Sequence, residues 1–246
     1  MTSTLVLTTA AAVGAVVASY VTTAAMRATS DVEVREPRSR CDGCHRRLGW
    51  GESLPLVSFA VLRGRCRSCA SPISRLHLGG EAAGLAAGLA IAVIAPDYRA
   101  IPLAIIAATL LAASVIDLRI RQLPDLMIAV IALAGMSLAA LHGLDAWITG
   151  VVTALCLYGL FAGVSMAYRR LRGKVGLGMG DVKLIAALAC WLGLATPWVM
   201  VAAMSLAIVR VMIARPVDGK VTTGPLLAAS GFTIGLLLEA GLWPRL

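Results

Sequence analysis

Two aspartates occupy positions where long apolar segments meet short polar ones. Asp117 closes one apolar run, and Asp181 opens another directly after the glycines Gly178 and Gly180. Ionisable residues at membrane depth are costly and therefore suggest function. Two neighbouring carboxylates share a proton, so one takes a proton from water while the other polarises a carbonyl. The pair predicts aspartic-protease chemistry, which needs no metal ion and no covalent intermediate.

Structural explanations for the same acids stay open. Aspartate is a favoured helix N-cap, which would account for Asp181. Asp117 has no such explanation, because a carboxylate at the end of a helix opposes the helix dipole. Glu81 and Asp125 also fall near the predicted inner membrane boundary, and Lys183 follows Asp181 by two residues. Satisfying a helix start is the simple explanation for Glu81.

Four cysteines form a second group with chemical meaning: Cys41, Cys44, Cys66 and Cys69. Two C-x2-C pairs in short turns are typical of a structural zinc site with four thiolate ligands. Two disulfides or an iron centre are the alternatives, and His45 could replace one ligand. Residues 27–78 are predicted to be cytoplasmic, where disulfides rarely persist, and this favours structural Zn²⁺.

The elements that position these groups are predicted to be membrane helices. Of the 246 residues, 59% are hydrophobic and 14% are charged, against about a quarter charged in soluble domains. Apolar runs of roughly 20 residues can cross a bilayer, and there the backbone must be helical. Gly193 and Pro197 are expected to divide the run 181–214 in two. The sequence therefore predicts an all-α polytopic membrane protein with eight spans, near residues 5–26, 79–95, 99–116, 124–142, 146–168, 181–194, 196–214 and 224–243.

Charge supports this topology. No Lys or Arg precedes the first run, so we expect a retained helix with its N-terminus outside rather than a signal peptide. The segments that would then lie inside hold 20 of the 22 Lys and Arg residues, as the positive-inside rule expects. The net charge of +9 is thus explained by topology, and a nucleic-acid partner is not expected.

The ordered motifs resemble those of the prepilin peptidases, or type IV leader peptidases, a family of GxGD-type membrane aspartyl proteases. The resemblance covers nearly the whole chain. The matching pieces are Pro-Arg-Ser-Arg-Cys-x-x-Cys at 37–44, Leu-Pro-Leu-Val-Ser at 54–58, Leu-Arg-Gly-Arg-Cys-Arg-x-Cys at 62–69, Pro-Ile-Ser at 72–74, Glu81, the aspartate block at 116–125, Gly-x-Gly-Asp-x-Lys at 178–183 and Gly-Pro at 224–225.

The resemblance implies a specific activity. Family members remove a short basic leader from pilin-like precursors, after a glycine, at the cytoplasmic membrane face. Asp117 and Asp181 match the two catalytic aspartates, Gly178 and Gly180 match the motif glycines, and the cysteines match the zinc tetrad. Asp125 matches a family acid for which we expect no catalytic role. The implied organisation is a first transmembrane helix (1–26), a cytoplasmic four-cysteine zinc-binding domain (27–78) and a seven-helix membrane peptidase domain (79–246) in the bacterial cytoplasmic membrane.

A second activity and a second class of function stay open. Many family members also methylate the new N-terminus with S-adenosylmethionine. The corresponding segment here, within the first predicted span, reads Ala18-Ser19-Tyr20-Val21-Thr22-Thr23. It lacks the Asn of the family pattern Gly-Ser-Phe-x-Asn-Val, although Arg27 is present. The alternative class is a membrane transporter or channel with buried acids, which would give the four-cysteine domain no role.

Overall fold

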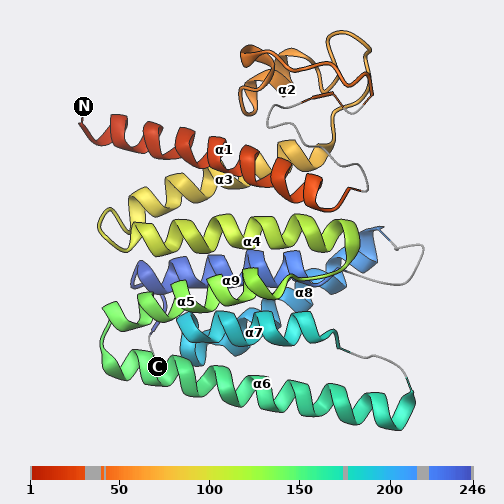
Figure 1. Cartoon of the computed structure of the whole chain (residues 1–246). Helices are drawn as coiled ribbons and strands as arrows, with labels where there is room; N and C mark the ends of the chain where they lie inside the picture. The colour runs from red at the N-terminus through yellow and green to blue at the C-terminus, as the bar shows by residue number, and fades with distance from the viewer. Residues whose placement is uncertain (1, 31–39, 42, 174–176, 215–221, 245–246) are drawn as a thin grey trace. The chain divides into compact units, whose positions relative to one another are not determined.

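The computed structural model describes all residues except 1, 31–39, 42, 174–176, 215–221 and 245–246 (Figure 1). Part of the motif at 37–44 and several of the predicted inner basic residues therefore lie outside the described residues. The described part is helical, with two isolated bridges and no strand, which confirms the all-α prediction. Its elements are α1 (Thr2–Ala28), η1 (Trp50–Glu52), α2 (Val57–Val61), α3 (Arg75–Ile94), α4 (Ala100–Ile120), α5 (Asp125–Leu141), α6 (Leu144–Arg172), α7 (Met179–Leu192), η2 (Gly193–Ala195), α8 (Thr196–Ala214) and α9 (Gly224–Glu239).

The chain divides into two compact units, Met1–Val93 and Ile94–Leu246. In the first unit, α1 and α3 pack through small residues. A Cβ added at Gly84 would collide with Ala18, and one added at Gly14 would collide with the Gly84 carbonyl oxygen. Small residues at such positions allow the backbones of membrane helices to approach closely. The first unit is thus a tightly packed helix pair that also carries the four-cysteine module, residues 40–74.

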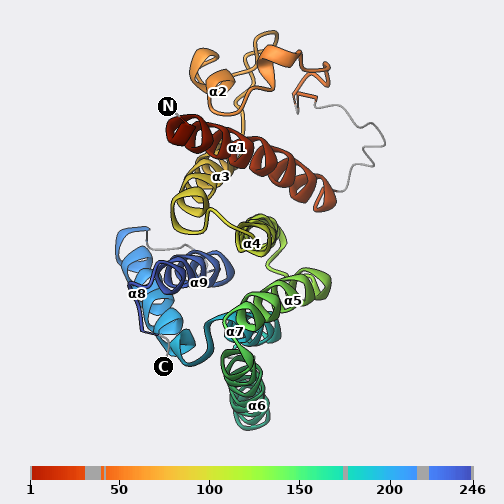
Figure 2. The ribbon, with the colours of Figure 1, turned by 90° about the vertical axis from the view of Figure 1, so that its left-hand side faces the viewer.

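In the second unit, α7 is the central helix. It packs against α5, α6, α8 and α9, while α4 packs against α5 and α9. Figure 2 shows α7 between α5 and α6, and α9 beside α4 and α8. Almost every residue of α7 from Val182 to Leu192 is buried. Asp181 directly precedes this buried stretch and is itself partly buried.

The predicted break within 181–214 is present in the structure. α7 ends at Leu192, η2 follows, and α8 begins at Thr196 with Pro197 as its second residue. Gly193 has φ +51°, which a residue with a side chain rarely adopts. By length and hydropathy, five described segments could cross a membrane, and Met179–Ile213 counts as one of them although it contains both α7 and α8. α5 and α9 are shorter apolar helices.

Helix α4 continues beyond the predicted run 99–116. The Arg121 N–H donates to the Asp117 carbonyl at 2.9 Å, and Arg121 then ends the helix in the left-handed conformation. Asp117 therefore lies in the last turn of α4 rather than after it.

A buried carboxylate joins four helices at the opposite end of the second unit. The Glu239 side chain has no exposed surface and accepts hydrogen bonds from Arg99, His142 and Trp191 at 3.0–3.2 Å. These residues lie at the starts or ends of α4, α5, α7 and α9. The cluster fixes the helix ends on the side away from the two aspartates.

Candidate active site

Asp117 is held in a nearly closed environment. Its side chain projects from the last turn of α4, and the residue is 8% exposed. Its Oδ2 atom is shielded from solvent and has no hydrogen-bond partner among the described residues. Buried polar atoms in proteins are usually paired, with water if not with protein. Asp117 thus keeps a buried acceptor atom without a protein hydrogen bond, beside the backbone of Gly224.

Asp181 is held by a direct hydrogen bond. It is the third residue of α7, so it does not cap the helix; Gly178 is the N-cap and makes no side-chain bond. The Thr223 hydroxyl donates to Asp181 Oδ2 at 2.6 Å. The first turn of a helix also stabilises negative charge. The structural alternative from the sequence, that Asp181 serves as an N-cap, is therefore wrong.

The start of α9 brings the two aspartates together. Thr223 bonds to Asp181, and the next residue, Gly224, faces Asp117 so closely that an added Cβ would lie 2.7 Å from Oδ2 and 3.0 Å from Cγ. Two adjacent residues at one helix N-terminus thus contact both acids.

The neighbouring motif residues shape this site without joining the pair. Lys183 Nζ lies 2.6 Å from Asp125 Oδ1, which links the first turn of α7 to the first residue of α5. A Cβ at Gly180 would be 3.2 Å from Leu123 Cβ, and one at Gly178 would be 3.5 Å from Asp181 Oδ2. Gly180 therefore permits a close approach to Leu123, whereas the contact at Gly178 is an ordinary one. The exposed Asp125–Lys183 ion pair bridges the two helix starts.

The four predicted metal-ligand cysteines come together in the first unit. All four Sγ atoms lie within 4.8 Å of one another, and Cys41 Sγ is 3.6 Å from Cys69 Sγ. None is in a disulfide, which would need about 2.05 Å between sulfurs. Four thiolates at about 2.3 Å from a zinc ion would be separated by nearly the observed spacing. The residues present therefore fit a tetrahedral metal ion.

Each cysteine pair sits in the same kind of turn. The residue after the second cysteine, His45 or Ala70, has positive φ and donates its N–H to the carbonyl of the first cysteine, Cys41 or Cys66. Bonds from the Cys69 and Ser68 N–H groups lower the pKa of the Cys66 thiol to about 6. Ionised thiols are the form that binds metals.

Glu81 connects α1, α3 and the four-cysteine module. It is 7% exposed, and its two carboxylate oxygens accept from the Ser19 hydroxyl and from the Leu56 N–H, each at 2.7 Å. It therefore belongs to the first unit and has a positioning role there. The explanation from the sequence, that it satisfies a helix start, holds for the N-cap of α2 rather than for its own helix.

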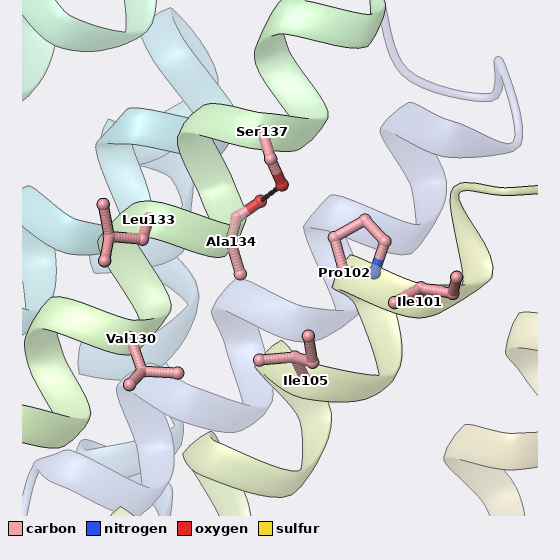
Figure 3. A pocket seen from close by; sticks show the side chains of 7 residues that line it. All are labelled: Ile101, Pro102, Ile105, Val130, Leu133, Ala134 and Ser137. Carbon is pink, nitrogen blue, oxygen red and sulfur yellow. Dashed lines mark hydrogen bonds between the residues drawn. The ribbon is translucent and has the colours of Figure 1, made fainter.

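A separate cavity of about 280 Å³ lies between α4 and α5 (Figure 3). Its lining is apolar apart from Ser137, whose hydroxyl donates to the Ala134 carbonyl at 2.7 Å. It contains no titratable side chain among the residues that line it, and we assign it no part in the chemistry.

Sequence reasoning missed Thr223. The Gly-Pro motif at 224–225 marked the place, but a threonine before a helix ordinarily caps that helix. Here it makes no capping bond to α9 and instead bonds to Asp181. Only the packing of α9 against α7 reveals this use.

Comparison with known proteins agrees with the motifs. The bacterial peptidase A24 N-terminal domain matches residues 12–95, and the type IV leader peptidase family matches residues 104–213. The chain is 35% identical over 202 residues to a prepilin leader peptidase/N-methyltransferase of Burkholderia pseudomallei, covering 79% of this chain and 65% of that protein. It is 32% identical over 208 residues to a type 4 prepilin-like proteins leader peptide-processing enzyme of Escherichia coli O78:H11, covering 82% of this chain and 76% of that protein.

The helices are apolar enough to cross a membrane, and the matches specify the family of the chain. The chain belongs to the type IV leader peptidase family. It spans just under two thirds of the length of the Burkholderia relative. A relative from Klebsiella pneumoniae is 37% identical over 164 residues, 64% of this chain and 69% of that protein. No solved structure matches. The resemblance inferred from the motifs is confirmed.

Proposed function

We propose that the chain is a prepilin leader peptidase that cleaves the short basic leader of pilin-like precursors after a glycine. The observation that carries this proposal is the start of α9, where Thr223 and Gly224 contact Asp181 and Asp117 respectively. An arrangement of this kind supports a pair of acids that act jointly on one substrate. Relatives named prepilin leader peptidases support the substrate class.

In the proposed reaction, the ionised carboxylate accepts a proton from water as the water oxygen attacks the scissile carbonyl carbon. The protonated carboxylate donates its hydrogen to the carbonyl oxygen and stabilises the tetrahedral intermediate. When the intermediate collapses, the C–N bond breaks and the leaving amine takes the proton that the first carboxyl group took from water. One hydroxyl of the intermediate returns a proton to the second carboxylate, which restores the starting pair. Asp117 and Asp181 exchange roles as proton acceptor and donor, so no metal ion enters this chemistry.

We also propose the location and the metal. The spans would cross the bacterial cytoplasmic membrane with the N-terminus outside and the active site facing the cytoplasm, since that orientation places 20 of the 22 basic residues inside. The thiolates of Cys41, Cys44, Cys66 and Cys69 would hold a structural Zn²⁺ ion, which closes the small module.

Methylation of the new N-terminus is a second proposal, and it rests on the relatives named N-methyltransferases. S-adenosylmethionine would supply the methyl group. The departure at residues 18–23 from the family pattern makes this the activity that needs its own readout.

The proposed function is tested with purified protein in lipid vesicles and several pilin-like precursors. Mass spectrometry of the products should show cleavage after the leader glycine and, with S-adenosylmethionine added, a mass gain of one methyl group. Cleavage without methylation would support the peptidase activity and exclude the methyltransferase activity. If folded protein cleaves no precursor, the transporter or channel alternative replaces it.

A further inference from the structure

Part of the four-cysteine module exposes large apolar side chains. Trp50 is 92% exposed, Val61 74%, Val57 56% and Leu54 53%. Val57 and Val61 are four residues apart and lie on the same face of α2. Clusters of exposed apolar residues on a small module usually mark a contact surface. We call residues 50–61 the apolar segment of the module.

The inner side of this segment is already packed. Phe59 of α2 faces Gly64, where an added Cβ would lie 2.9 Å from the Phe59 ring. α2 therefore has one face turned to the module, and the face with Val57 and Val61 turned away from it. The two exposed valines therefore do not belong to the core of the module.

Glu81 fixes the segment at a defined depth along the membrane helices. It accepts the Leu56 N–H just before α2 and also bonds to Ser19 of α1. Glu81 is six residues from the start of α3 at Arg75, and Ser19 is nine residues from the end of α1 at Ala28. At 1.5 Å per residue, these positions are roughly 9 and 13 Å inward from the helix ends. The start of α2 thus lies alongside the membrane helices rather than beyond them.

The local backbone shows how firmly the segment is held. Leu56 has φ +61° and ψ −45°, and the Val57 N–H donates to the Pro55 carbonyl at 2.6 Å. This is a γ-turn of the strained type, which persists only where its surroundings determine it. Glu81 supplies the acceptor for the Leu56 N–H, which has few water partners near the membrane boundary.

The charge of the module suits a membrane surface. Arg63, Arg65 and Arg67 are exposed and lie just after the apolar segment. Basic clusters next to membrane helices attract anionic lipid headgroups, and tryptophan is enriched at the level of the headgroups. The apolar side chains, the arginines and the depth set by Glu81 all favour contact with an anionic lipid surface.

We propose that residues 50–61 form an interfacial segment that inserts into the boundary between lipid headgroups and acyl chains, with Glu81 as its anchor. The occupant of the exposed face is the anionic bilayer in which α1 and α3 sit. The four-cysteine module is then docked on the membrane surface instead of standing free in water. This inference does not depend on the proposed peptidase activity.

The test measures where Trp50 sits in vesicles of phosphatidylcholine and phosphatidylglycerol. The fluorescence of wild type minus that of Trp50→Phe isolates Trp50, and wild type minus Trp191→Phe gives a buried control. Brominated lipids should quench Trp50 most when the bromine is near the headgroup, and aqueous acrylamide should quench it weakly. Strong acrylamide quenching without lipid quenching would overturn the proposal, and so would protection from both, because a protein surface would then cover Trp50.

A second comparison tests the anchor. Glu81→Leu should raise acrylamide quenching of Trp50 by several-fold, while Asp145→Asn, at an exposed acid of the second unit, should leave it unchanged. Bound metal is measured in both variants to show that the module is intact. Unchanged quenching in Glu81→Leu with normal metal content would remove Glu81 from the proposal.

A further comparison tests the role of lipid charge, with vesicles made of neutral lipid alone. If brominated lipid no longer quenches Trp50 in these vesicles, the anionic headgroup is the attractive partner. Equal quenching in neutral and anionic vesicles would overturn the role of the anionic headgroup.

Discussion

At the scale of single residues, the protein holds its two aspartates differently. Asp181 Oδ2 accepts a hydrogen bond from Thr223, whereas Asp117 Oδ2 has no partner among the described residues and faces the backbone of Gly224. This difference suits a pair in which one carboxyl group is ionised and the other is protonated. Two such groups titrate jointly. The sequence predicted both acids from their position and spacing, but it could not predict Thr223, whose contact depends on the packing of α9 against α7.

Replacing the Thr223 hydroxyl should slow catalysis without weakening substrate binding. Thr223→Val keeps the shape but removes the donor to Asp181, and a hydrogen bond to a charged group contributes about 1.5–3 kcal/mol. We expect kcat for precursor cleavage to fall roughly 10- to 100-fold with KM nearly unchanged. Thr223→Ser should restore most of the rate, and equal loss in the Val and Ser variants would contradict the proposed role.

A side chain at position 224 should displace Asp117. In Gly224→Ala the new Cβ would lie 2.7 Å from Oδ2, so the carboxylate must move. A shift of about 1 Å at a catalytic group can cost on the order of 100-fold in rate. The matched control is Gly163→Ala in α6, where no atom lies within 4 Å and activity should stay normal. Full activity in Gly224→Ala would show that the close approach has no catalytic consequence.

At the scale of elements, the polar contacts that hold the helices of the second unit together lie near the helix ends and not in their apolar middles. The apolar runs were long enough to predict α1 and α3 to α9 but not the short α2, and Gly193 and Pro197 marked the break between α7 and α8. The Glu239 cluster was not predicted, because a lone acid near the end of a helix is most simply explained by loop chemistry. The structure instead buries it among three donors from different helices.

Neutralising Glu239 should destabilise the second unit. Removing one partner of a buried charged network typically costs about 3–5 kcal/mol, and Glu239→Ala leaves the Arg99 guanidinium without this acceptor. We expect a clearly lower thermal midpoint in detergent, measured by loss of helical circular dichroism. Asp145→Asn, an exposed acid, serves as the control and should be neutral. An unchanged midpoint in Glu239→Ala would show that the cluster does not contribute to stability.

Metal removal should loosen the four-cysteine module and leave the second unit folded. Metal binding to four thiolates couples to folding of a small domain, and acid releases the metal by protonating the ligands. Elemental analysis of wild type should show one zinc per chain, falling as the pH is lowered, and Cys66→Ser should lower it at neutral pH. Chelation should speed protease cleavage within residues 40–74 more than elsewhere. Zinc-free protein with an equally resistant module would contradict the structural role.

At the scale of the whole molecule, composition and charge predicted the fold class better than local motifs did. The low charged fraction and the distribution of basic residues predict a helical membrane protein, and five described segments are long and apolar enough to cross a bilayer. What the sequence could not give is which residues meet, since Asp117, Asp181 and Thr223 are far apart in the chain and come together only through α4, α7 and α9. The predicted domain limits and the orientation in the membrane stay predictions.

The most direct measurement is precursor cleavage by Asp117→Asn, Asp181→Asn and the double variant, each reconstituted in vesicles and checked for folding by circular dichroism. If the acids act as one unit, each single variant should lose nearly all activity and the double variant should be no worse, because residues that act together have non-additive effects. Substantial cleavage by either single variant would contradict the account and remove that aspartate from the mechanism.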